Sequence, residues 1–321
     1  MAEINRSGVV RTVASVALVG AIIWWAGASE TFALLGSASL AGIALLVLLH
    51  AADRVLMAYK WWRLLRARGY PVGMGDATRG YFLASFVGAV LPVAGGADLA
   101  RIAAMRGKGA GTESLTSSVA LERAIGAISH GLFCLAAIGL AVALSIELDV
   151  SNGVLAVAAA TAVVLLTLCL PLTFSIAGLV ATQFVEAAGF RGKIARLAAD
   201  YAGWSRHPRE LWIFLALTFI EGFYPIVAYY AAAWALGVDA SLVHMAIAVP
   251  LAFLLARLPI PLPSLGPEQG MFIFVATQLG MSQDGAAAIT LLFLGTLLIA
   301  FAPGAVLWMS SSSTNQAAGP N

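Results

Sequence analysis

Charged side chains lie inside segments that are otherwise apolar, and these are the residues with which the chain could do chemistry. Of the 321 residues, 61% are hydrophobic and 11% are charged, whereas about a quarter of a soluble domain is charged. Placing an ionisable group in hydrocarbon costs on the order of 2.5–3.5 kcal/mol on insertion scales, so each such group marks a candidate function. These groups are Asp53, Arg54, Asp98, Arg101, Glu122, Arg123, Glu221, Arg257 and Glu268.

Arginines and glycines near two breaks in the apolar pattern predict a phosphate pocket inside the membrane. A guanidinium group binds phosphate oxygens in a two-pronged geometry and stays charged at any working pH. A helix that begins within the membrane adds unpaired N–H groups and the positive end of its dipole, which also favour an anion. The predicted headgroup-binding residues are Arg101, Arg123 and Arg257, with Gly95, Gly96 and Gly266 at the two helix starts.

Four carboxylates are the natural partners of these arginines. They would hold the arginines while the pocket is empty, or one of them would carry a coupling proton. An acid at the start of a half-helix also complements the helix dipole. The competing interpretation is that these charges form internal salt bridges that only fix helix register. The carboxylates are Asp98, Glu122, Glu221 and Glu268.

Two histidines and one charged pair carry weaker signals. His50 and His130 fall within apolar spans and could relay protons, but a lone histidine in a helix bundle more often serves packing. Arg54, next to Asp53, lies close enough to a span end for its guanidinium to reach the headgroup region. We therefore leave these four residues outside the predicted site.

The sequence offers no pattern for a cofactor, a metal or a covalent mechanism. No histidine and carboxylate cluster has metal-ligand spacing, no serine or cysteine has a visible partner base, and there is no phosphate-binding P-loop. Cys134 and Cys169 both lie in apolar spans, which speaks against a disulfide framework. A net charge of +2 gives no basis for nucleic-acid binding.

The elements that must position these groups are membrane-spanning helices. A hydrocarbon core of about 30 Å requires about 20 apolar residues as helix, and six segments reach that length. The expected spans are 9–28, 40–59, 118–145, 154–180, 212–234 and 286–309. The first also resembles a cleavable secretory signal, with Arg6 and Arg11 at its N-terminal end, although its apolar run is longer than usual for a signal. Whether this segment is retained stays open.

Most lysines and arginines lie in alternate connections between the spans. The connections 29–39, 146–153, 237–241 and 281–285 contain neither residue. The basic residues lie instead before the first span, in 60–108 and in 191–209. By the positive-inside rule, this asymmetry places both termini in the cytoplasm.

Two apolar regions are too short or too broken for a simple crossing. The first, 81–93, measures about 20 Å as a helix, breaks at 91–96 and returns to basic residues. The second runs from His244 through a proline-rich break at 259–267 to Gly280. Because the charge is alike on both sides of each region, each is predicted to be a re-entrant hairpin; a single proline-kinked span is the alternative.

The order of elements repeats with inverted orientation. Span, hairpin and span occur at 40–145 and again at 212–309. Interrupted hydrophobic segments at matching positions of inverted halves indicate a transport site near the midplane. We therefore expect an all-α polytopic membrane protein, with six transmembrane helices and two re-entrant helical hairpins in one domain, 1–309. An amphipathic cytoplasmic connector is expected at 183–209 and a disordered polar tail at 310–321.

Three motifs resemble those of the lysylphosphatidylglycerol-synthase transmembrane family, flippase-like proteins related to the membrane half of bacterial aminoacyl-lipid synthases. At 91–101 the chain is similar to the family's Leu-Pro, Gly-Gly, acid and Arg signature, with one residue inserted before the acid. At 122–126 it has the acid-arginine pair that starts the next span. At 259–268 a proline and glycine break precedes a glutamate, but Pro263-Ser264 stands where the family usually has two glycines.

The resemblance implies translocation of a lipid across the bacterial inner membrane, without the soluble aminoacyl-transferring domain. Related members occur with hopanoid, glycolipid and polyprenyl-phosphate pathways, so the implied cargo is an anionic phospholipid, a glycolipid or a polyprenyl-phosphate lipid, moved by alternating access. Two other classes stay open. One is a membrane-embedded lipid-phosphate transferase or phosphatase with Glu122 or Glu268 as general base, and the other is an accessory subunit that presents lipid to a synthase. A homodimer or a complex with a lipid-synthesis enzyme also stays open.

Overall fold

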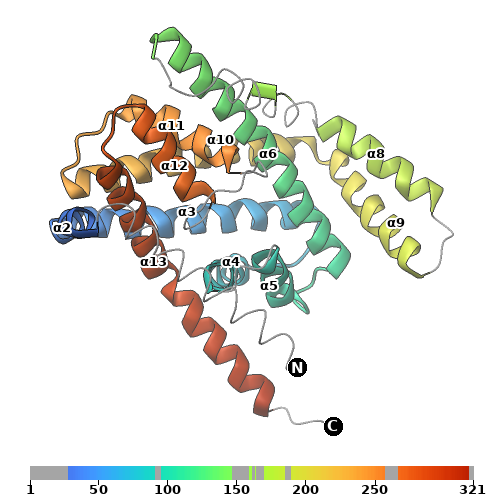
Figure 1. Cartoon of the computed structure of the whole chain (residues 1–321). Coiled ribbons are helices and arrows are strands. Elements are labelled where there is room, and N and C mark those ends of the chain that lie inside the picture. Colours follow the sequence, from blue (N-terminus) through green and yellow to red (C-terminus); the bar gives the residue numbers. More distant parts are fainter. Residues whose placement is uncertain are drawn as a thin grey trace. The chain divides into compact units, whose positions relative to one another are not determined.

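Helices make up the regular structure of the described part of the chain. The computed structural model describes residues 28–90, 95–146, 159–160, 163, 170–184, 189–256 and 267–317, and these contain no strand. In chain order (Figure 1) the elements are α2 Ala28–Gly36, α3 Leu40–Ala67, α4 Met74–Val90, α5 Gly96–Met105, α6 Thr112–Ala143, α8 Leu170–Gln183, α9 Gly189–Ala202, η1 Gly203–Arg206, α10 Pro208–Leu236, α11 Leu242–Leu255, α12 Pro267–Gln278 and α13 Gln283–Ala317.

Among the described residues, four helices are long and apolar enough to cross a membrane: Leu40–Ala67, Thr112–Ala143, Pro208–Leu236 and Gln283–Met309. They coincide with four of the six predicted spans, so the prediction of a multi-pass, all-helical membrane protein is confirmed. The predicted span 9–28 lies outside the described residues except for its last position, and about half of 154–180 does as well. The count of six therefore stays a prediction.

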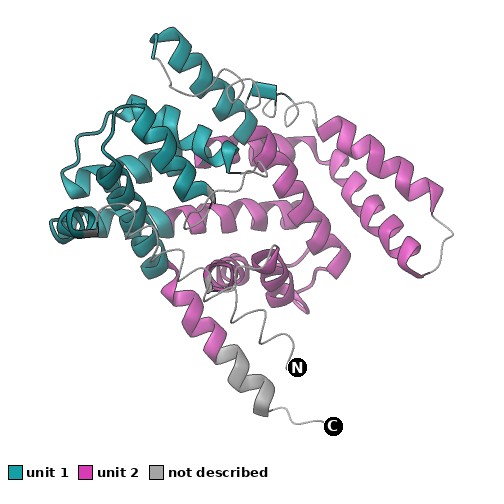
Figure 2. Ribbon diagram, viewed as in Figure 1, with its two compact units in different colours: residues 1–51, 130–166, 222–300 teal, residues 52–129, 167–221, 301–321 magenta. Residues whose placement is uncertain are grey.

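The chain folds into two compact units that each contain parts of all four long helices. Unit 1 consists of residues 1–51, 130–166 and 222–300, and unit 2 of 52–129, 167–221 and 301–321 (Figure 2). Each unit therefore draws on both of the inverted halves that the sequence predicts. Within unit 2, α3 enters by its C-terminal part, α6 and α10 by their N-terminal parts, and α13 by its C-terminal part.

Two helix pairs flank the predicted breaks. In unit 2, α4 packs against α5, with Gly88 opposite Ala97 and Gly80 opposite Met105, so the two helices run antiparallel. In unit 1, α11 packs against α12. The tips of both pairs, 91–94 and 257–266, lie outside the described residues. The helical pairs are thus where the sequence predicts them, and their re-entrant course stays a prediction.

Small side chains allow the helices of unit 1 to approach one another closely. Gly42 of α3 lies against Ala235 of α10, where a Cβ atom at position 42 would overlap that alanine. The core of the unit includes further buried alanines, Ala228 and Ala232 of α10 and Ala287 of α13. Membrane helices lack a hydrophobic driving force between them, so close packing of small residues is a main source of their association.

The connector between α8 and α10 is held to α6 and to the end of α3 by a partly buried polar cluster. Asp200 of α9 accepts hydrogen bonds from Arg68 at 2.7 Å, from Ser114 at 3.1 Å and from Ser117. Trp204, which is fully buried, donates to Ser117 Oγ at 3.1 Å. The sequence predicts an amphipathic surface segment here, and the structure adds that its C-terminal end is anchored to α3 and α6.

The last helix differs from the sequence expectation at its C-terminal end. α13 runs to Ala317, whereas the composition predicts disorder from Ser310 onward. Extending an existing helix adds one backbone hydrogen bond for each residue fixed, which is far easier than starting a new helix. No glycine or proline interrupts residues 310–317, so the helix can continue into this polar segment.

Gly304 fixes the distance between α13 and α4, and its replacement tests that packing. A Cβ atom at position 304 would overlap the carbonyl oxygen of Phe82 and lie 2.7 Å from Phe86 Cβ. We expect Gly304→Ala to lower the free energy of unfolding by about 1–3 kcal/mol, the usual effect of overpacking. Thermal unfolding in detergent measures the change.

The matched control is Gly295→Ala on the same helix, where a Cβ atom would have no neighbour within 4 Å. This variant should be neutral or stabilising by about 0.5–1 kcal/mol, because alanine is the better helix former. Equal behaviour of the two variants would contradict the close approach of α13 to α4.

Candidate functional site

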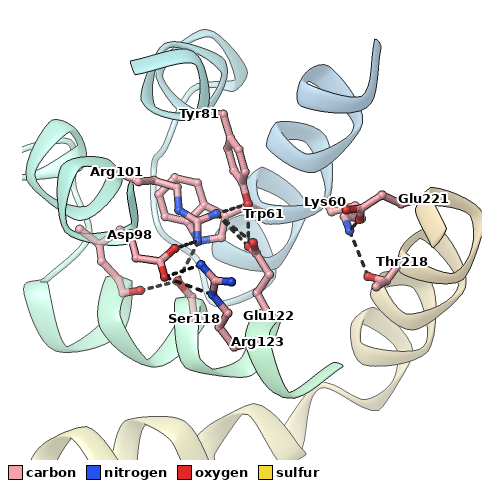
Figure 3. A network of polar contacts seen from close by, with 11 residues as sticks. Lys60, Trp61, Tyr81, Asp98, Arg101, Ser118, Glu122, Arg123, Thr218 and Glu221 are labelled. Atoms are coloured by element: carbon pink, nitrogen blue, oxygen red, sulfur yellow. Dashed lines mark hydrogen bonds and ion pairs between the residues drawn. The ribbon is translucent and has the colours of Figure 1, made fainter. Parts of the chain in front are cut away.

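Arg101 of α5 lies at the centre of a buried polar network in unit 2. The residue is 2% exposed. Its guanidinium carbon lies 4.6 Å from the ring centroid of Trp61 and 4.4 Å from that of Tyr81 (Figure 3). A desolvated guanidinium held over aromatic faces gains about 2 kcal/mol or more from each favourable contact. The two rings therefore compensate part of the cost of burying this charge.

The hydrogen bonds of Arg101 join two carboxylates and a phenol. Its Nη1 donates to both oxygens of Glu122, at 3.1 and 2.9 Å, and to the hydroxyl of Tyr81. That hydroxyl in turn donates to Glu122 Oε2 at 2.6 Å. On the other side, Arg101 Nη2 donates to Asp98 Oδ1 at 3.3 Å, the longest of these contacts. Arg101 is thus held by its own partners in this state.

Asp98 connects this buried arginine with an exposed one. Arg123 donates to Asp98 Oδ2 from Nε at 3.1 Å and from Nη2 at 2.8 Å. The side chain of Arg123 is 68% exposed, against 3% for Arg101 and 20% for Asp98. Each oxygen of Asp98 therefore serves a different arginine, and Arg123 is the cation of the network that an outside molecule can reach.

Local sequence explains how these side chains meet. Gly95 has a left-handed conformation, φ 75°, and α5 begins immediately after it without a side-chain cap. Asp98 follows in the first turn, where a negative charge complements the helix dipole, and Arg101 lies one turn further on the same face. On α6, the buried Glu122 points toward Arg101 while its neighbour Arg123 is exposed.

A second buried ion pair in the same unit joins Glu221, a predicted carboxylate, to Lys60, which was not predicted as part of the site. Lys60 of α3, whose side chain is 1% exposed, pairs with Glu221 of α10 and donates to Thr218 Oγ1 at 3.1 Å (Figure 3). Its ammonium nitrogen lies 5.0 Å from the ring centroid of Phe214. The predicted span ends at Tyr59 and leaves Lys60 among the loop cations, which is wrong because α3 continues to Ala67.

One signal in the sequence could have found Lys60. Asp53 and Lys60 are seven residues apart, which places them on the same face of a helix two turns apart. A charge on the same face as an intramembrane acid is a better candidate for burial than one at a span end. Tyr81 gives no such signal, because nothing in the sequence around it distinguishes a phenol in the network from an ordinary aromatic residue at a membrane boundary.

The remaining predicted residues are placed only in part. Gly95 is exposed and Gly96 is the first residue of α5. Glu268 lies in the first turn of α12, which belongs to unit 1. Arg257 and Gly266 lie outside the described residues. The predicted convergence of the second break on the arginine network therefore stays a prediction.

The two histidines contact neighbouring side chains, His50 by hydrogen bonds and His130 by ring stacking. His50 Nε2 is 2.9 Å from Thr296 Oγ1, and its Nδ1 hydrogen-bonds the hydroxyl of Tyr224. The ring of His130 stacks on that of Phe253, with centroids 6.1 Å apart. In the parts of the chain that the structure describes, no three His, Cys, Asp or Glu side chains are grouped so that they could hold a metal ion.

Comparison with known proteins places the chain in a family. The family model described as the lysylphosphatidylglycerol synthase TM region matches residues 12–304, nearly the whole chain. A search of curated proteins and a search of solved structures each found no match. The matched range includes the broken hairpin of α4 and α5, the acid-arginine pair of α6 and all four long helices up to Gly304. The chain is therefore a member of the lysylphosphatidylglycerol synthase transmembrane-region family.

Proposed function

We propose that this protein moves a phosphate-bearing or otherwise anionic lipid between the leaflets of the bacterial inner membrane, with both termini in the cytoplasm. Membership of the family supports a role in membrane lipid chemistry. The observation that carries the proposal is the exposed Arg123, which among the described residues is held by Asp98 at the edge of a network that is otherwise buried. Such an arginine can exchange one anionic partner for another.

Asp98 occupies the position that a headgroup phosphate would take. It presents one oxygen to two N–H groups of Arg123 and the other to Arg101, and phosphate oxygens are bound by arginine in the same geometry. An exposed ion pair contributes only about 0–1 kcal/mol, so exchanging Asp98 for a headgroup at Arg123 costs little. Once Asp98 moves, Arg101 Nη2 also becomes available to the headgroup.

The start of α5 adds a second attraction for an anion. The first N–H groups of a helix have no partner within it, and Gly95 provides no side chain to cap them. Because Gly95 is exposed, the positive end of this helix is open to a ligand. The N–H groups and dipole of α5 thus support the same charge preference as the arginine.

The buried and the exposed residues of the network have different roles in this proposal. Arg101, Glu122 and Tyr81 form charge-assisted hydrogen bonds away from water, and breaking them would leave an unpaired buried charge. They hold the hairpin and α6 in register, whereas Arg123 and Asp98 exchange partners. We also propose headgroup or counter-charge roles for Arg257, Gly266 and Glu268 of the second predicted hairpin.

Arg123→Gln tests the proposal directly. The variant should exchange fluorescent phosphatidylglycerol between vesicle leaflets about 10–100-fold more slowly, because loss of a charged hydrogen bond to the headgroup is worth about 1.5–3 kcal/mol. The full-length protein is reconstituted in vesicles, and dithionite bleaching of the outer leaflet reports the exchange. Recovery of chemically unchanged lipid separates transport from a transferase or phosphatase.

The matched control is Arg196→Gln. Arg196 is 60% exposed and pairs with Glu113 at 3.7 Å, so the change in charge and exposure is similar but lies away from the network. It should exchange lipid like the wild type. Wild-type exchange by Arg123→Gln would count against Arg123 as the headgroup ligand.

A further inference from the structure

Asp53 of α3 is a buried carboxylate that the proposed headgroup site does not use. Its side chain is 1% exposed, and its Oδ2 is bound by the guanidinium of Arg54. The other oxygen, Oδ1, is buried and has no hydrogen-bond partner in the described part of the chain. A carboxylate oxygen without a donor is unfavourable away from water, and its free lone pairs accept a proton without breaking an existing contact.

The charged groups that face Asp53 form a small balanced set in unit 2. Arg54 is 21% exposed and lies over the ring of Phe301, with the guanidinium carbon 5.6 Å from the centroid. Glu221 of α10 interacts electrostatically with Asp53, and Glu221 is itself paired with Lys60. With all four groups ionised, two positive and two negative charges cancel.

The predicted-site acids of unit 2, Asp98, Glu122 and Glu221, all pair with a cation. Both oxygens of Glu122 accept from Arg101, and each oxygen of Asp98 accepts from an arginine. Protonating either residue would break a charge-assisted hydrogen bond. Asp53 lies outside that site, and its unpartnered Oδ1 can accept a proton without breaking a contact of its neighbours.

We propose that Asp53 is the proton-coupling residue of this protein, so that the anionic lipid moves together with one proton; this inference rests on the proposed function. The proton comes from the aqueous phase on one side, adds to Oδ1 and converts the carboxylate into a neutral acid. The set of four groups then carries a net charge of +1, which compensates one negative charge of a headgroup in the membrane. After the lipid is released, Oδ1 returns the proton to the opposite aqueous phase.

The experiment measures a steady state and therefore does not depend on how fast each variant works. Vesicles containing the full-length protein and fluorescent phosphatidylglycerol are given a gradient of one pH unit. With one proton per lipid, the wild type should enrich the lipid about tenfold in the leaflet that faces the more alkaline side, since one pH unit is equivalent to a factor of ten. A protonophore should abolish this ratio, and clamping the membrane potential should leave it unchanged because the transported unit is neutral.

Asp53→Asn should bring the ratio to about one, and Asp53→Glu should restore it. The matched control is Asp76→Asn, which removes an acid paired with Lys108 at 3.2 Å in the same unit and should keep the wild-type ratio. An Asp53→Asn variant that still enriches the lipid tenfold would overturn the assignment. Enrichment driven by a sodium gradient in place of the pH gradient would also overturn it.

A measurement on the wild type keeps the proposal testable if the variant does not fold. Dicyclohexylcarbodiimide reacts with protonated carboxyl groups in apolar surroundings, so peptide mass spectrometry should find Asp53 labelled, and less so as the pH rises. Labelling of other acids without Asp53 would contradict the proposal. Rapid lipid exchange by the wild type without any enrichment would end the coupling proposal and leave the transport function intact, whereas no exchange of lipid at any pH would reject the transport function itself.

Discussion

Arg101→Met is expected to lower the free energy of unfolding by about 3–5 kcal/mol, because it leaves Glu122 buried without its cation. The side chain of Glu122 is 11% exposed and both of its oxygens accept from Arg101. Methionine fills the space between Trp61 and Tyr81 but cannot neutralise the carboxylate. Equilibrium unfolding in mixed detergent micelles, followed by circular dichroism, gives the change.

The neighbouring arginine provides the control for this prediction. Arg123→Met removes the same type of charge from a side chain that is 68% exposed, so the free energy of unfolding should change by less than about 1 kcal/mol. Adding Glu122→Gln to Arg101→Met should recover much of the lost stability, since the uncompensated charge is removed. Equal destabilisation by Arg101→Met and Arg123→Met would contradict the division between a buried holding arginine and an exposed binding arginine.

The arginine network shows which part of the site could be predicted from the sequence. Arg101, Glu122 and Arg123 are charges within apolar segments, and Asp98 follows a glycine turn, so the cost of burying a charge is enough to single them out. The structure brings these four residues together in unit 2. Sequence could not state which arginine is buried, because this depends on which face of α6 meets α5.

Other parts of the network could not be predicted because their signals are not local. Trp61 and Tyr81 are 20 residues apart on different helices, and only the packing of α3 against α4 and α5 brings both rings to Arg101. Periodicity does locate the four long apolar helices, since apolar length is a property of each segment alone. The division into two units cuts through each of these helices, and no composition shift along the chain marks such a boundary.

The second large loss of stability is expected when the buried pair of Lys60 and Glu221 is broken. Lys60→Met should lower the free energy of unfolding by about 3–5 kcal/mol, because Glu221 would keep a charge without its partner. The ammonium group also donates to Thr218 and lies over the ring of Phe214, and both contacts are lost. Unfolding in mixed micelles again measures the change.

A double-mutant cycle separates the pair from its surroundings. Replacing a whole buried ion pair by neutral groups is often close to neutral, so Lys60→Met with Glu221→Gln should lie within about 1–2 kcal/mol of the wild type. The implied coupling between the two positions, about 2–4 kcal/mol, exceeds the value for exposed pairs. Additive effects of the two single changes would mean that Lys60 is buried for packing alone. A large coupling would instead show that the Lys60–Glu221 pair holds α3 to α10. Because Glu221 also interacts electrostatically with Asp53, the charge set proposed to carry the proton would then also hold two membrane-spanning helices together.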